Sequence, residues 1–347
     1  MGRAKMDGGV NSGMRYNDLE FFNVSELTKL EHFPGVRLNR FPENIRSAIE
    51  RKTPVSFSRG CEIRFVFLDG GAAIAYLLAA DEDGEALIFF GDYMCSRVAL
   101  PKGIITPVHI SFPELMKRDF DELNNKSRYS KNLCRIFLNN KAVVHFVGFE
   151  SHHCKVAPPQ AKDLPDKTWV AYGSSITHGA GASSNNNSYV QLCARLLKSQ
   201  ALNLGMSGAC GCEKDIGDYI ASLHNLDFVF LELGVNMRLG YTLEEFEKRV
   251  LYLIETIASK QKKVFVTTIY PNLQTYNKEG SIFEKEASYN EALRRIASKN
   301  KSGNVCLIEG TELLTNFSDL SADLLHPSDS GHINMGYNLY NKIKQLI

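Results

Sequence analysis

The sequence predicts two domains of different fold classes: an all-β sandwich of the jelly-roll type, then a three-layer α/β/α domain built on a parallel sheet. The chain has 347 residues, which is long for one domain. Apolar residues form short runs from about residue 54 to residue 157, whereas strand and helix patterns alternate beyond about residue 160. The segment KVAPPQAKDLPDK, rich in proline and charge, separates the two patterns. We therefore expect domains over residues 1–160 and 161–347.

The first domain is predicted from short apolar runs that are separated by turn residues. In CEIRFVFLDGG, Ile63, Phe65 and Phe67 fall on one face and Glu62 and Arg64 on the other, which is the period of a strand. Similar runs are AAIAYLLA, ALIFF, TPVHISF, CRIFLNN and AVVHFVGF. Many short strands without long helical patterns are typical of a β-sandwich or jelly roll.

The second domain is predicted from strands that alternate with amphipathic helices. The helical pattern TLEEFEKRVLYLIETIASK begins with Thr242 and Glu245, the two residues of a capping box. EASYNEALRRIAS and GYNLYNKIKQLI also have helical patterns. The nearly continuous apolar strands indicate a parallel sheet covered on both faces. These strands are expected at residues 168–172, 200–204, 226–233, 262–269 and 304–309.

The charge balance excludes some classes of partner. Lysine and arginine number 40 and aspartate and glutamate 39, so no basic surface for nucleic acid or an anionic membrane is expected. No apolar run reaches the roughly 18 residues of a membrane span, and the N-terminus lacks the apolar segment of a signal peptide. A cytoplasmic location is therefore expected. A homo-oligomer is compatible with the sequence.

The eight cysteines are scattered and form no CxxC pair. Cys210 and Cys212, and the run His152-His153-Cys154, are weak candidates for metal ligands. No second ligand cluster accompanies either group, so we interpret the cysteines as small buried apolar residues and the run as a strand end or linker. No metal or cofactor is expected.

Four polar loops follow strands of the predicted parallel sheet or precede its last helix. They contain Gly173-Ser174-Ser175-Ile176-Thr177, GMSGACG, Gly234-Val235-Asn236 and SADLLHPSDSGH. Ligands of such sheets bind outside the carboxyl ends of the strands. All four loops are therefore expected to open on the same edge of the sheet.

At these loops the chain resembles the SGNH (GDSL-type) hydrolases over about residues 168–347. Four blocks match in order, which is much more specific than one block alone. They are YGSSITHG with Ser175 at the nucleophile position, NLGMSG with Gly208, ELGVN with Asn236, and DLLHP with Asp323 and His326.

One position departs from the name-giving motif of this family. Ser174 stands where that motif has an aspartate, which is not a member of the family's catalytic triad. Serine at this position resembles a branch in which an N-terminal β-sandwich precedes the hydrolase domain, as in several two-domain carbohydrate esterases. The sandwich expected over residues 1–160 fits this branch.

The resemblance implies a role for each matched residue. Ser175 would be the nucleophile, His326 the base and then the general acid, and Asp323 the carboxylate that orients the imidazole. The backbone N–H groups of Ser175 and Gly208 and the amide of Asn236 would stabilise the oxyanion.

Each assignment has an alternative. Ser175 could cap a helix, Ser174 could be the reactive serine if the register slips by one, and His178 is the nearest other base. Asn236 and Gly208 could be plain turn residues.

The last loop holds a second Asp-x-x-His pair, Asp329 with His332, and spacing cannot separate it from Asp323 with His326. Pro327 follows the family's His-Pro pattern and favours the first pair. The segment SDSGH is typical of the start of the last helix.

The resemblance implies a serine esterase without cofactor that acts through an acyl-enzyme. We expect it to hydrolyse short acyl esters, acetyl first, on a small molecule or oligosaccharide. A lysophospholipase or thioesterase of the same family is an alternative. A non-catalytic carbohydrate-binding protein is the alternative from another class.

Overall fold

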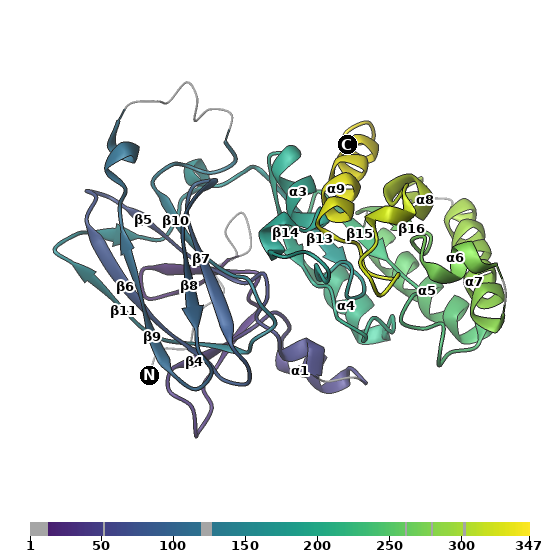
Figure 1. The fold of residues 1–347 in the computed structure, drawn as a ribbon, viewed down its shortest axis with the longest axis horizontal. Helices are drawn as coiled ribbons and strands as arrows, with labels where there is room; N and C mark the ends of the chain where they lie inside the picture. Colours follow the sequence, from purple (N-terminus) through teal and green to yellow (C-terminus); the bar gives the residue numbers. More distant parts are fainter. Residues whose placement is uncertain (1–12, 51–52, 119–126, 261, 279, 301–302) are drawn as a thin grey trace. The chain divides into compact units, whose positions relative to one another are not determined.

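The computed structural model describes most of the chain (Figure 1). The described residues are 13–50, 53–118, 127–260, 262–278, 280–300 and 303–347. The expectation of no signal peptide concerns the N-terminus, of which residues 1–12 lie outside the described residues.

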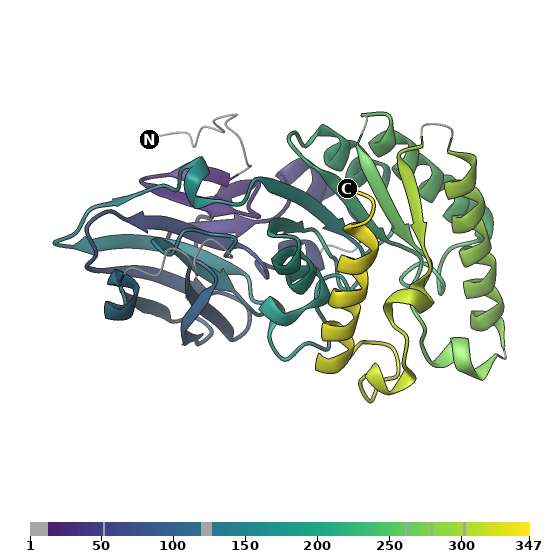
Figure 2. The same ribbon diagram turned by 90° about the horizontal axis from the view of Figure 1, so that it is seen from above.

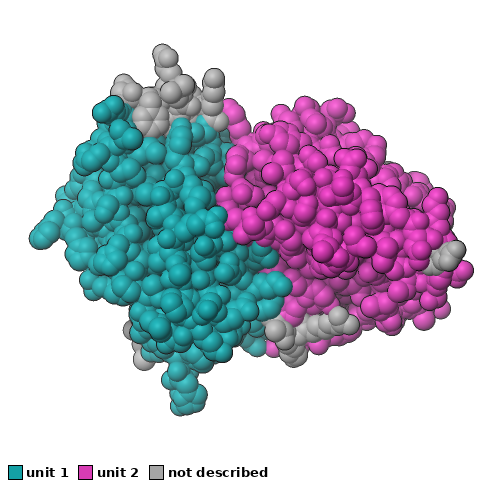
Figure 3. All heavy atoms as spheres, in the orientation of Figure 1, with its two compact units in different colours: residues 1–43, 55–166 teal, residues 44–54, 167–347 magenta. Residues whose placement is uncertain are grey.

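The contacts divide the chain into two compact units, coloured separately in Figure 3. Unit 1 comprises residues 1–43 and 55–166, and unit 2 comprises residues 44–54 and 167–347. Residues 44–54 were expected in the first domain, whereas the structure groups them with unit 2. Sequence patterns follow the order of the chain, so they do not reveal which unit a short segment packs with.

Unit 1 is a β-sandwich of two antiparallel sheets. One sheet has the strand order β1-β2-β5-β10-β7-β8, with β12 paired to β5, and the other has the order β3-β4-β11-β6-β9. Buried side chains from both sheets, such as Phe65 and Leu77, belong to a single core cluster. The predicted all-β first domain is therefore confirmed. Its strands are β1 (Gly13–Tyr16), β2 (Leu19–Phe22), β3 (Glu26–Thr28), β4 (Val36–Asn39), β5 (Glu62–Phe67), β6 (Ala72–Ala79), β7 (Gly84–Phe90), β8 (Tyr93–Leu100), β9 (Ile105–Ser111), β10 (Leu133–Leu138), β11 (Val144–His152) and β12 (Val156–Ala157).

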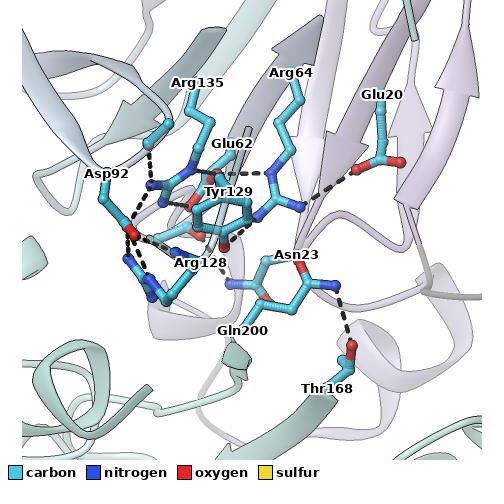
Figure 4. A network of polar contacts seen from close by, with 12 residues as sticks. Glu20, Asn23, Glu62, Arg64, Asp92, Arg128, Tyr129, Arg135, Thr168 and Gln200 are labelled. Carbon is cyan, nitrogen blue, oxygen red and sulfur yellow. Dashed lines mark hydrogen bonds and ion pairs between the residues drawn. The ribbon is translucent and has the colours of Figure 1, made fainter. Parts of the chain in front are cut away.

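The second face of strand β5 carries charged residues that are nevertheless buried. Glu62 accepts hydrogen bonds from Arg64 at 2.7 Å and from Arg135 at 2.6 Å (Figure 4). Burial alone would raise the pKa of Glu62, but the two guanidinium groups outweigh it and lower the pKa to about 2. Arg64 also pairs with Glu20 at 3.4 Å. The alternation seen in the sequence thus separates an apolar core from a buried ionic network.

Unit 2 is built on a five-stranded sheet with the order β14-β13-β15-β16-β17. All four strand pairings are parallel. The strands are β13 (Lys167–Tyr172), β14 (Ser199–Asn203), β15 (Phe228–Glu232), β16 (Lys263–Thr267) and β17 (Val305–Ile308). Each overlaps a strand expected from the sequence.

Helices cover both faces of this sheet (Figure 2). Helix α3 packs against α9, while α4 packs against α5 and α5 against α7. Strand β15 is buried at all five positions, as expected for a central strand between two helical layers. The predicted α/β/α domain is therefore confirmed. The α-helices are α1 (Glu43–Ala48), α3 (Tyr189–Leu196), α4 (Lys214–Ser222), α5 (Leu243–Ala258), α6 (Leu273–Asn277), α7 (Ser281–Lys299), α8 (Gly310–Leu313) and α9 (Asp329–Ile343).

The helix ends follow local sequence signals. The side chain of Thr242 accepts a hydrogen bond from the backbone N–H of Glu245 and caps α5. Ser328 caps α9 by accepting from the N–H of Gly331. No helix within the described ranges is both long and apolar enough to cross a bilayer.

Candidate active site

Ser175 lies in the loop that leaves the carboxyl end of β13. The loop turns back on itself, because the N–H of His178 donates to the carbonyl of Ser174 at 3.0 Å. The hydroxyl of Ser174 accepts from the N–H of Ile176 at 3.1 Å. Ser174 is fully buried and Ser175 is half-buried. Of the two adjacent serines, Ser174 therefore stabilises the turn and Ser175 reaches the surface.

The loop before α9 carries Asp323 and His326. The carboxylate oxygen Oδ1 of Asp323 accepts backbone N–H bonds from Leu325 at 3.0 Å and from His326 at 2.9 Å. Its other oxygen, Oδ2, lies 2.6 Å from Nδ1 of His326. Burial acts to raise the pKa of Asp323, but the hydrogen bonds from His326, Leu325 and Ser321 hold it well below its usual range. The loop itself thus keeps this carboxylate charged and directed at the imidazole.

The structure brings the two loops together. The hydroxyl oxygen of Ser175 lies 2.7 Å from Nε2 of His326. The imidazole therefore stands between a hydroxyl and a carboxylate. In such a row it can take the hydroxyl proton while the carboxylate stabilises the imidazolium that forms.

The structure places the second Asp-x-x-His pair elsewhere. His332 is completely buried in α9, where its Nε2 lies 2.9 Å from the carbonyl oxygen of Ala180 and its Nδ1 accepts from the N–H of Tyr189. Asp329 accepts a hydrogen bond from the N–H of Ser183. The two side chains therefore contact different parts of the chain, and neither contacts Ser175 by a described hydrogen bond.

The described hydrogen bond of the His178 ring is made to a different serine. The ring is buried, and Nδ1 lies 3.0 Å from the hydroxyl of Ser207. Among the three histidines that the sequence analysis considered as bases, the structure places His326 against Ser175.

Gly208 and Asn236 follow strands β14 and β15, which lie on either side of β13 in the sheet. The backbone of Gly208 has a φ of 69°, in the left-handed region that favours glycine. The amide oxygen of Asn236 accepts the N–H of Cys210 at 3.1 Å, which fixes the orientation of this side chain. Gly208 and Asn236 line a small pocket of about 10 Å³, which also contacts Glu50, Glu213 and Tyr241.

A larger pocket of about 150 Å³ opens beside the serine. Ser175 and Asn236 both lie on its wall, together with apolar side chains and one arginine. Its lining residues are Ser175, Ile176, Val235, Asn236, Arg238, Leu239 and Leu325. The guanidinium of Arg238 is paired with Glu286. This pocket can hold a small, largely apolar group next to the hydroxyl of Ser175.

Glu232 is a site residue that was not expected from the sequence. It ends β15, is 2% exposed, and accepts hydrogen bonds from the N–H of Ser174 at 2.6 Å and from the hydroxyl of Thr177 at 3.1 Å. Burial raises the pKa of its carboxyl to about 7, although these hydrogen bonds act in the opposite direction. The sequence feature that could have indicated Glu232 is an acidic residue at the end of the otherwise apolar strand FVFLE.

The described residues contain no cluster of three or more His, Cys, Asp or Glu side chains of the kind that holds a metal ion. Cys210 and Cys212 are both buried, and the thiol of Cys210 contacts the carbonyl oxygen of Glu232 at 3.8 Å. Burial, followed by hydrogen bonding to Cys212, holds the pKa of Cys210 well above its usual range. Cys154 donates to the carbonyl of Ala72. The thiols of Cys210 and Cys154 therefore have backbone carbonyl partners.

A hydroxyl, an imidazole and a carboxylate in a row at the carboxyl edge of a parallel sheet form the arrangement that serine hydrolases use. The model of the GDSL-like Lipase/Acylhydrolase family matches residues 166–344, and the chain belongs to this family. Membership places it among the esterases and acylhydrolases. No curated protein sequence matches the chain.

Solved structures share the fold at low sequence identity. The salicylyl-acyltransferase SsfX3 from a tetracycline biosynthetic pathway is 14% identical, with a TM-score of 0.77 over 95% of both chains. A family two carbohydrate esterase from Clostridium thermocellum, in complex with cellohexaose, is 17% identical, with a TM-score of 0.56 over 83% of this chain and 92% of that one. The acetyl xylan esterase Est2A from Butyrivibrio proteoclasticus is 13% identical, with a TM-score of 0.54 over 86% and 94%. The similarity covers both units and concerns the fold.

Proposed function

We propose that the protein is a serine esterase that removes short acyl groups, acetyl first, from carbohydrates through an acyl-enzyme. The observation that carries this proposal is the row of three groups at the sheet edge. The hydroxyl of Ser175 lies 2.7 Å from Nε2 of His326, and Nδ1 of the same ring lies 2.6 Å from Asp323.

In the first half of the reaction, His326 takes the proton of Ser175 as the hydroxyl attacks the ester carbonyl. Asp323 stabilises the resulting imidazolium and holds its tautomer. The tetrahedral intermediate collapses when the imidazolium protonates the leaving alcohol, and the acyl group stays on Ser175. Water, activated by His326, then releases the acid and restores the serine.

The oxyanion requires donors that are already in position. We propose the backbone N–H groups of Ser175 and Gly208 and the side-chain amide of Asn236 for this role. Two observations support Asn236: it shares a pocket wall with Ser175, and its amide oxygen is occupied by the N–H of Cys210. The nitrogen of that amide is the group that remains to act as donor.

The size of the pocket and the relatives support a short acyl group on a sugar. A volume of about 150 Å³ suits a small acyl group better than a long chain. Similar structures include a carbohydrate esterase in complex with cellohexaose and an acetyl xylan esterase. We propose a small-molecule or oligosaccharide ester as the substrate. We also propose a cytoplasmic location, because the eight cysteines are free and the cytoplasm keeps thiols reduced.

Acyl transfer to an alcohol is a second candidate activity. It is favoured by the similarity to a salicylyl-acyltransferase over 95% of both chains. The acyl-enzyme would be the same, and an acceptor hydroxyl would replace water in the second half of the reaction. Product analysis with and without a sugar acceptor separates the two, because transfer yields a new ester where hydrolysis yields free acid.

The test measures acetate release from 4-nitrophenyl acetate and from acetylated xylo-oligosaccharides. Ser175→Ala is expected to lower kcat by at least about 1000-fold on both substrates. Ser183→Ala, at an exposed serine eight residues further along the chain, is the matched control and should retain activity. Equal activity of wild type and Ser175→Ala contradicts the proposal. A preference for long acyl chains over acetyl contradicts the substrate assignment and favours a lysophospholipase or thioesterase.

A further inference from the structure

We propose that Glu232 is a positioning residue for the nucleophile: its carboxyl fixes the turn that carries Ser175. The inference rests on the proposed function, because it assigns a role to a residue behind the proposed nucleophile. Glu232 belongs to the central strand β15, whereas the turn follows β13. The carboxyl therefore links the reactive loop to the most buried strand of the sheet.

The contacts of the carboxyl converge on the turn. Oxygen Oε2 of Glu232 accepts the backbone N–H of Ser174 at 2.6 Å and the hydroxyl of Thr177 at 3.1 Å. These two residues lie on either side of Ser175 in the sequence. Holding the N–H of Ser174 fixes the Gly173–Ser174 peptide just before Ser175, and holding the hydroxyl of Thr177 fixes the turn just after it. The direction of the Ser175 hydroxyl and of its N–H then depends on Glu232.

The turn is built to admit this carboxyl. A side-chain carbon on Gly173 would lie 2.6 Å from Oε2 of Glu232 and 2.4 Å from the hydroxyl of Thr177, so only glycine leaves the space. The hydroxyl of Ser174 accepts the N–H of Ile176 and completes the turn. An aspartate at position 174, as in the family's name-giving motif, would put a second carboxyl beside the first.

The surroundings of Glu232 provide hydroxyl and amide donors instead of a positive charge. Tyr189 of α3 lies 2.7 Å from the hydroxyl of Thr177, and Tyr270 follows β16 and contacts Tyr189. The thiol of Cys210 contacts the carbonyl of Glu232. No ion pair joins Glu232 to a cation within the described residues, and burial raises the pKa of its carboxyl to about 7. A buried carboxyl with these contacts serves as a hydrogen-bond acceptor in either charge state.

Two substitutions of Glu232 test whether its carboxyl positions the turn, because both groups that donate to it are known. In Glu232→Gln, the amide oxygen can still accept from Ser174. The same oxygen, in the place of Oε2, can also accept from the hydroxyl of Thr177, which can in turn accept from the hydroxyl of Tyr189. In Glu232→Ala, the N–H of Ser174 loses its partner and the turn loses its anchor.

We expect Glu232→Ala to lower kcat on 4-nitrophenyl acetate about 100-fold with KM within threefold, because a shift of the nucleophile by about 1 Å has an effect of this size. Glu232→Gln is expected to recover kcat to within tenfold of wild type. The rate of inactivation by diisopropyl fluorophosphate, which reports on Ser175 directly, should follow the same order. A merely structural role would lower the amount of folded protein in both variants without this split between kcat and KM.

Two results would overturn the positioning role: a folded Glu232→Ala with kcat within threefold of wild type, or a Glu232→Gln as impaired as the alanine variant. If Glu232→Ala does not fold, the variant Thr177→Val tests the positioning role instead. It removes one anchor of the carboxyl at nearly constant volume, and it should lower kcat at least threefold; an unchanged kcat contradicts the role. Ser175→Ala is measured alongside. An active Ser175→Ala contradicts the proposed function, whereas an inactive one beside a fully active Glu232→Ala contradicts only the role of Glu232.

Discussion

The hydroxyl of Ser175 lies 2.7 Å from Nε2 of His326, although 151 residues separate the two in the chain. The serine follows the second strand of the sheet order, and the histidine belongs to the loop before the last helix. Parallel strands place their carboxyl ends on one edge, and this topology lets two distant loops meet.

The two histidines near the C-terminus should respond differently to substitution. His326→Ala is expected to lower kcat at least about 1000-fold with little effect on stability, since the side chain is partly exposed. His332→Ala is expected to destabilise the protein by about 2–4 kcal/mol. The substitution opens a cavity, and it removes the imidazole that contacts the carbonyl of Ala180 and the N–H of Tyr189. Steady-state kinetics and urea unfolding of both variants provide the measurement. Loss of turnover in a folded His332→Ala, with His326→Ala active, would reverse the assignment.

Asp323 should matter for the tautomer of His326 more than for folding. Asp323→Asn keeps the shape of the side chain but replaces the acceptor of the Nδ1 proton, and we expect kcat to fall about 10³- to 10⁴-fold. The carboxyl is about half exposed, so unfolding by urea should change little. Asp329→Asn is the matched control, since Asp329 accepts from Ser183 instead. An equal effect of both substitutions on kcat would contradict the prediction.

Asn236 should contribute to the transition state without contributing to substrate affinity. Asn236→Ala is expected to lower kcat about 100- to 1000-fold, the usual effect of removing one oxyanion donor, with KM nearly constant. Asn236→Asp, with similar shape and no amide donor, should be at least as impaired. Initial rates over a range of 4-nitrophenyl acetate concentrations separate kcat from KM. A variant that raises KM alone would assign Asn236 to ground-state binding.

The stability of unit 2 should depend on pH through Glu232. The carboxyl has a pKa of about 7 in the folded protein against an ordinary value of 4.5. Below pH 4.5 the group is protonated in both states, so its contribution is fully present. As the pH rises through 7, ionisation favours the unfolded chain, and up to about 3 kcal/mol of stability is lost.

Glu232→Gln should remove this loss, so wild type should be more destabilised than the variant between pH 5 and pH 8. The single tryptophan of the chain, Trp169, is buried in unit 2, and its fluorescence during urea unfolding reports on that unit. Identical pH dependence of the two proteins would show that Glu232 does not titrate in this range.

Much of the fold follows from local patterns in the sequence. Nearly continuous apolar runs located the strands of unit 2 to within a few residues, and period-3.6 patterns indicated its helices, because a parallel sheet is buried on both faces by amphipathic helices. Strands β1 to β4 precede the range in which the pattern was clear. Packing of residues 44–54 with unit 2 was also not predictable, since it depends on contacts that are distant in the chain.

The candidate site, like the fold, was predictable from the sequence only in part. Sequence blocks alone indicated Ser175, Gly208, Asn236, Asp323 and His326 as candidates. Spacing did not separate Asp323 and His326 from Asp329 and His332, because both pairs have the same three-residue separation. The structure separates them through packing: His332 lies inside α9, and His326 lies against Ser175.

The sequence by itself determined the two fold classes and the family blocks, because hydrophobic periodicity and short motifs are local properties of the chain. Only the tertiary structure decided which serine, histidine and carboxylates meet. Ser174 is buried, whereas the hydroxyl of Ser175 reaches His326. The carboxyl of Glu232, from another strand, accepts the N–H of Ser174 and holds the turn that carries both serines. Such contacts depend on the register of neighbouring strands and on the directions of their side chains, which no local pattern contains.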